Sequence, residues 1–98
     1  MNKVTVKYET GLKAALMNSD EAAAYLDAAL EADDQAVFLL ALRDIADAYG
    51  LSRVAQDTLL NRENLYRMLS STGNLQLSSL MTLLRSIGLR LTVQVAPI

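Results

Sequence analysis

The sequence predicts one mainly α-helical domain, residues 1–98, with five helices and a C-terminal β-strand. Apolar residues make up 52% of the chain and only five residues are aromatic, and this composition, dominated by Leu and Ala, favours helices. Apolar positions recur at helical spacing from Ala22 to Ile87. In residues 89–98, apolar and polar residues alternate from Leu89 to Val95, which is the period of a strand.

The N-terminal residues 1–17 are predicted to form an arm, in which residues 4–8 alternate like a short strand. A lone strand leaves its backbone groups unpaired, so the C-terminal strand needs a partner. Two pairings are open: with residues 4–8 of the same chain, or with its symmetry mate across a dimer.

Two amphipathic helices are predicted within residues 18–50, the more acidic part of the chain. Asn18 stands three residues before Glu21, the spacing of a capping box, and Asp34 is placed to cap the second helix. Gly50 lies where a left-handed C-terminal cap would end that helix. The predicted buried stripes are Ala22, Tyr25, Leu26, Ala29 and Leu30, then Phe38, Leu42, Ile45, Ala46 and Tyr49.

Three shorter helices are predicted within residues 51–88. The loop before the last one contains Gly73 and Asn74, the strongest turn signal in the chain, and Gly88 ends the last one. The predicted spans are Ser52, as a cap, to about Thr58; Arg62 to about Leu69, capped by Asn61; and Gln76 or Ser78 to Ile87. The predicted inward residues are Val54, Ala55, Leu65, Met68, Leu69, Leu80, Leu83, Leu84 and Ile87.

The first two of these three helices have the features of a helix-turn-helix. Ala55 is a small inward residue that lets a second helix cross closely, and Leu59–Asn61 is the tight turn. The second helix has an apolar back and a polar front whose Arg, Asn and Tyr side chains can contact base edges and phosphates in a DNA major groove. The alternative is an ordinary solvated helix face. The predicted DNA-contacting residues are Arg53, Asn61, Arg62, Glu63, Asn64, Tyr66, Arg67, Ser71 and Asn74.

Charge is distributed unevenly along the chain, whose net charge is −2. Residues 1–49 carry four Lys or Arg and nine Asp or Glu, a net −5, whereas residues 50–98 carry five Arg and two Asp or Glu, a net +3. The acidic half could face a basic protein partner while the basic half meets phosphate. The alternative is that both halves are ordinary solvated surfaces.

The composition argues against several classes of protein. Cys and His are both absent, which removes disulfides, thiolate metal sites and the commonest general base. We therefore predict no enzyme activity, no metal and no cofactor. Residues 1–17 lack the unbroken apolar stretch of a secretory signal, and no run approaches the ~20 apolar residues of a membrane helix. A cytoplasmic protein without a membrane partner is predicted.

Several blocks of sequence, in order and with matching spacing, are similar to one known family. From about Asp20 to Val93 the chain resembles the bacterial addiction-module antidotes, the HigA-like antitoxins whose helix-turn-helix is related to phage repressors. The matching blocks are residues 24–26, 28–30, 40–46, 54–55, 62–69 and 73–74, then Leu80 and residues 87–91.

The resemblance implies a lambda-repressor-like fold and a homodimer that binds a palindromic operator and represses its own operon. It also implies a RelE/ParE-like toxin as protein partner, and DNA contacts at Arg62, Asn64 and Arg67 with Asn61 as helix cap. The family usually has Gly where this chain has Leu59, which predicts either an altered turn there or packing of Leu59 that offsets the strain. Leu75 stands where Pro is common, which predicts a less rigid loop.

Two other functions compete with the antitoxin interpretation. One is a stand-alone, phage-type transcriptional regulator without a toxin. The other is a helical adaptor that binds only proteins, for which the helix pair would never contact DNA.

Overall fold

The structure, a computed structural model, describes residues 11–12, 14–58 and 60–97. The described residues between 11 and 16 are helical. None of the helices in this part of the chain combines the length and apolar character needed to cross a bilayer. The five helices that follow, in the positions predicted for residues 18–88, are α2 (Ser19–Glu31), α3 (Gln35–Tyr49), α4 (Leu51–Thr58), α5 (Arg62–Met68) and α6 (Leu77–Ser86).

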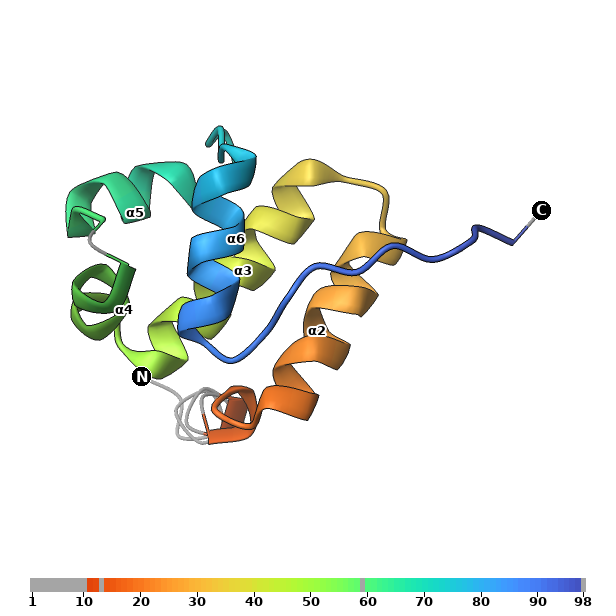
Figure 1. Ribbon diagram of the computed structural model, residues 1–98, viewed down its shortest axis with the longest axis horizontal. Helices are drawn as coiled ribbons and strands as arrows, with labels where there is room; N and C mark the ends of the chain where they lie inside the picture. Colours follow the sequence, from red (N-terminus) through yellow and green to blue (C-terminus); the bar gives the residue numbers. More distant parts are fainter. Residues whose placement is uncertain (1–10, 13, 59, 98) are drawn as a thin grey trace, which may run out of the picture.

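The helices are arranged along the long axis of the molecule (Figure 1). The short helices α4 and α5 lie at one end, α2 and the C-terminal segment lie at the other, and α6 runs between them. The longest helices, α2 and α3, pack against each other, and Tyr25 Oη of α2 donates a hydrogen bond of 2.6 Å to Asp44 Oδ2 of α3. The two ends therefore present separate surfaces.

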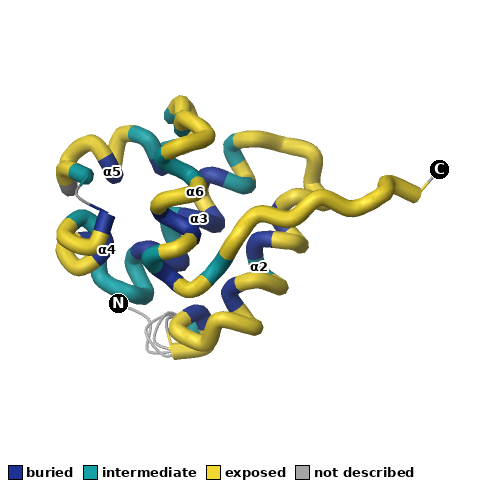
Figure 2. Tube along the Cα trace, in the orientation of Figure 1, coloured by how far each residue is buried: buried dark blue, intermediate teal, exposed yellow. Residues whose placement is uncertain are grey.

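A single hydrophobic core joins all five helices, and Figure 2 shows the buried positions on their inward sides. Most predicted stripe residues are buried or half-buried, but Leu30 is 58% exposed and its predicted burial is wrong. Leu30 lies on the last turn of α2, beside the C-terminal segment instead of under another helix. The largest fully buried side chains are Leu42, Ile45, Val54, Leu65, Leu69, Leu83 and Ile87.

The helix boundaries follow from local capping chemistry. Asn18 Oδ1 accepts hydrogen bonds from the Asp20 and Glu21 amides at 2.9 and 3.2 Å, which confirms the predicted start of α2. Asp34 Oδ1 accepts one from the Ala36 amide at 2.9 Å at the start of α3, also as predicted.

Gly50 ends α3 with a φ of 94°, in the region that favours glycine, as predicted. The predicted cap at Ser52 is wrong, because α4 already begins at Leu51. The Gly50 carbonyl accepts the Val54 amide at 3.0 Å, so the residue that ends one helix supplies the first carbonyl of the next.

The predicted C-terminal strand is wrong: no residue that the structure describes is in a strand, and residues 89–97 run as an irregular segment past α2 (Figure 1). Val93 and Val95 are 99% and 98% exposed, so their alternation with polar residues does not reflect burial of one face. A strand needs a neighbouring backbone to pair with, and the described part of the chain provides none. Residues 4–8, the predicted partner, lie outside the described residues, as does Leu59 of the turn.

The course of this segment is set at the end of α6. Gly88 has a φ of 80°, its amide donates to the Arg85 carbonyl at 3.1 Å, and the Leu89 amide donates to the Leu84 carbonyl at 2.8 Å. These two bonds form a Schellman motif, in which a left-handed residue satisfies the last carbonyls of a helix and reverses the chain. The chain therefore turns back toward α2.

The loop after α5 comes very close to that helix at Gly73. A Cβ atom at this position would lie 2.2 Å from the Met68 carbonyl oxygen and 2.7 Å from that of Arg67. The Gly73 amide donates to the Ser70 carbonyl at 2.9 Å, which closes a tight turn. Glycine is therefore required here by the approach of two backbones.

We predict that Gly73→Ala lowers the free energy of unfolding by about 2 kcal/mol, because the loop must move away from α5. For a domain of this size that corresponds to roughly 10 °C in Tm, measurable by thermal denaturation. Gly11→Ala is the matched control, since a Cβ there meets nothing within 4 Å. Equal melting temperatures for the two variants would contradict the close approach.

We also predict that Asn61→Ala destabilises the protein by about 1 kcal/mol, the usual cost of losing a helix N-cap. Asn61 Oδ1 accepts a hydrogen bond of 2.8 Å from the Glu63 amide at the start of α5. The control is Asn64→Ala, since Asn64 is exposed on the same helix and caps nothing. Urea unfolding should separate the two; a similar loss in both would rule out capping as the cause.

Candidate nucleic-acid interface

The helices α4 and α5 form a closely joined pair whose inner sides belong to the core. Val54 of α4 and Leu65 of α5 are buried, and Leu69, just after α5, is buried too. Ala55 and Met68 are half-buried against the same core, so all five predicted inward residues of this pair face inward. The burial of one side of α5 fixes which side remains for contact with other molecules.

The connection between the two helices is built from polar side chains. Thr58 Oγ1, at the end of α4, donates to the Val54 carbonyl at 2.7 Å and accepts from the Leu60 amide at 3.3 Å. Thr58 is 8% exposed, so its hydroxyl is buried. It supplies hydrogen bonds to backbone groups at the end of α4, where the helix itself no longer pairs them. Asn61 then caps α5 as predicted, and its side chain is exposed at the helix N-terminus.

The outward side of α5 carries the polar residues that the sequence assigned to DNA. Glu63, Asn64, Tyr66 and Arg67 are all exposed, Tyr66 at 39%. Arg62 is the first residue of α5, and its side chain lies outside the described part of the structure. The structure thus brings the described predicted residues of α5 to one accessible surface, which we call the α5 face.

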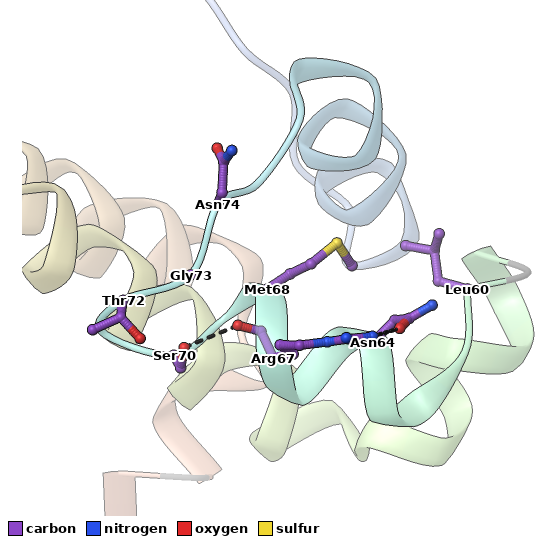
Figure 3. A pocket seen from close by; sticks show the side chains of 8 residues that line it. All are labelled: Leu60, Asn64, Arg67, Met68, Ser70, Thr72, Gly73 and Asn74. Atoms are coloured by element: carbon purple, nitrogen blue, oxygen red, sulfur yellow. Dashed lines mark hydrogen bonds between the residues drawn. The ribbon is translucent and has the colours of Figure 1, made fainter.

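Arg67 and Asn64 interact along this face. The Arg67 guanidinium donates a hydrogen bond to Asn64 Oδ1, one turn earlier in the helix. Figure 3 shows the Arg67 side chain extended along α5 toward Asn64. The Arg67 carbonyl accepts the Ser70 hydroxyl at 2.9 Å, which ties the following loop to the helix.

A cleft of about 420 Å³ lies between α5 and the loop that follows it (Figure 3). Asn74 lines this cleft from the loop side, whereas Ser71 is exposed but is not among the lining residues. The two predicted loop contacts are therefore both accessible, but only one shares the cleft with α5. The lining residues are Leu60, Asn64, Arg67, Met68, Ser70, Thr72, Gly73 and Asn74.

Arg53, the predicted contact on α4, is exposed and close to a carboxylate. Its Nε lies 4.0 Å from Asp57 Oδ2 one turn later, with side-chain exposures of 69% and 49%. Exposed pairs of this kind contribute little to stability. The guanidinium therefore remains accessible to an anion.

Arg43, which belongs to α3 in the acidic half of the chain, is not among the residues predicted to contact DNA. Its Cζ lies 5.0 Å from the centroid of the Tyr66 ring, within the range of a cation–π contact. The packing of α3 thus places Arg43 beside Tyr66 of the α5 face. The only signal in the sequence was that Arg43 is the sole cation between Lys13 and Arg53, and this does not locate it in space.

Comparison with known proteins identifies relatives that cover most of the chain. Residues 7–95 match a family model described as a probable addiction module antidote protein. The chain is also 37% identical over 79 residues, 81% of each chain, to an uncharacterized protein of Haemophilus influenzae. No solved structure gave a significant match. Because the family model spans nearly all of the sequence, including every helix described above, the chain belongs to the probable addiction module antidote family.

Proposed function

We propose that this chain is the antitoxin of a type II toxin–antitoxin module. It binds operator DNA as a homodimer through a helix-turn-helix formed by α4 and α5, represses its own operon, and neutralises a RelE/ParE-like toxin in the cytoplasm. The antidote family supports the antitoxin role. One observation carries the DNA-binding role: α5 exposes a polar face that includes Arg67 and has Arg43 over its Tyr66 ring, while its apolar side is buried in the core.

In this proposal α5 enters the major groove and reads base edges. Arg67 suits guanine, to which a guanidinium donates two parallel hydrogen bonds, and Asn64 suits adenine. The hydrogen bond between them holds the guanidinium along the helix in the free protein. On DNA this bond is exchanged for contacts with bases.

The phosphates on either side of the groove are bound by groups around α5. Arg53 approaches from α4 and Arg43 from α3, where it lies over the ring of Tyr66. Amides at the N-terminus of α5, next to Asn61, offer further donors to a phosphate. Such contacts position a protein on DNA without selecting the sequence.

A homodimer repeats these contacts on a palindromic operator. Two copies of α5 would enter successive major grooves, about 34 Å apart, one turn of the duplex. Neither repression nor neutralisation requires bond making or breaking by this chain. We therefore propose no catalytic role for any of its residues.

We predict that Arg67→Ala weakens binding to the duplex upstream of its own coding sequence by about 5- to 150-fold, the loss of one bidentate base contact. Combining it with Arg62→Ala should abolish binding while circular dichroism shows unchanged helix content. The control is Arg90→Ala, because Arg90 lies beside α2 at the other end of the molecule. Unchanged operator affinity in the double variant would contradict the assigned α5 face.

We predict that Arg43→Ala weakens binding to all duplexes alike and lowers the slope of log affinity against log salt by about one, as expected for one lost phosphate contact. Arg43→Lys keeps the charge and should keep the slope. Fluorescence anisotropy between 50 and 200 mM salt would measure both, a range over which several phosphate contacts produce a steep loss. A protein-binding adaptor would show no DNA binding at any salt concentration.

A further inference from the structure

A second concave surface lies at the end of the molecule opposite the α5 face. It is a groove of about 630 Å³ between α2, α6 and the C-terminal segment. Its apolar lining includes Ala23, Ala24 and Leu30 from α2, Leu80 from α6, and Leu91 from the C-terminal segment. We call this surface the α2 groove.

Several apolar side chains around this groove are exposed to solvent and are not packed into the core. Leu30 is 58% exposed although it belongs to a predicted buried stripe, and Leu91 is 44% exposed. Val93 and Val95 continue the exposed apolar residues along the same segment. An exposed apolar groove with a polar rim is typical of a protein-binding site.

The charge on the rim indicates the kind of partner. The helix α2 carries four carboxylates and no Lys or Arg, and one of the carboxylates, Asp27, lines the groove. The single cation among the lining residues is Arg90, on the opposite wall. The lining itself is neutral, with Asp27 and Arg90, and it is the other three carboxylates of α2 that favour a partner combining apolar side chains with positive charge facing α2.

A second copy of this chain is a poor candidate for that partner. A twofold contact through the groove would bring two copies of the same surface together. The groove surface of a second copy offers a single cation, Arg90, against the four carboxylates of α2, so most of the negative charge on that helix would stay unpaired. The groove thus favours a different, basic protein.

We propose that the α2 groove is the surface that captures the toxin, through a basic amphipathic segment whose apolar side chains enter beside Leu30. This inference rests on the proposed function, since it assigns the partner of that function to a site. Because the α2 groove and the α5 face lie at opposite ends (Figure 1), the antitoxin can hold DNA and toxin at once.

The test uses the small protein encoded beside this chain's gene as the probe, titrated against the full-length chain by calorimetry. Leu30→Asp places a charge in the groove and should weaken binding at least ten-fold. Leu91→Asp, outside any helix, should do the same without affecting helix stability. The matched control is Leu77→Asp, since Leu77 is 64% exposed on α6 and does not line the groove; its affinity should stay within two-fold of wild type.

The outcomes distinguish failure of the groove assignment from failure of the proposed toxin-neutralising function. If the wild-type chain binds the probe and both groove variants bind equally well, the groove assignment is overturned while the proposed function stands. If the wild-type chain does not bind the probe at all, the toxin-neutralising function fails and the inference with it. If light scattering shows that Leu30→Asp alters the mass of the free protein instead, the groove is a self-interface, which also overturns the assignment.

A second measurement tests the separation of the two ends. The wild-type chain, the probe and the upstream duplex should form a ternary complex in gel filtration. The Leu30→Asp variant should bind the duplex but not the probe. The Arg67→Ala variant should bind the probe but not the duplex. Mutual exclusion of probe and duplex in the wild-type chain would contradict separate surfaces.

Discussion

The packing of α5 against the core is the interaction on which the α5 face depends. This helix has seven residues, well below the length at which an isolated helix persists in water. It is held by Leu65 and Leu69, both fully buried, by the Asn61 cap at its start, and by the close approach of Gly73 at its end. The polar face can be presented in one orientation because the opposite side is fixed by these contacts.

Much of this architecture could be predicted from the sequence because it is set by local chemistry. Asn18, Asp34 and Asn61 each cap the helix that follows them, and Gly50 ends α3. The prediction at Ser52 failed because Gly50 joins two helices so directly that no separate cap intervenes. The prediction of a C-terminal strand was wrong for another reason. Alternation of apolar and polar residues describes the side chains along one segment, whereas a strand also requires a partner backbone.

The residues of the candidate sites also differ in whether local sequence or long-range packing determines their positions. Helical periodicity correctly separated the buried and exposed residues of α5, since both follow from one repeat. Arg43 could not be predicted, because its place over Tyr66 results from the packing of α3, far away in the sequence. The α2 groove could not be predicted either, because Leu30 continues the apolar stripe of α2 in the sequence but is left exposed in the fold.

The hydrogen bond between Arg67 and Asn64 has a consequence for the entropy of recognition. A free arginine samples many rotamers, and immobilising such a side chain on binding costs about 0.5–1.5 kcal/mol. Here Arg67 is already restrained along α5 before any ligand arrives, so part of that rotamer freedom is lost on folding. Because this bond must be exchanged when Arg67 contacts a base, the smaller loss of rotamer freedom is offset by the loss of the hydrogen bond to Asn64.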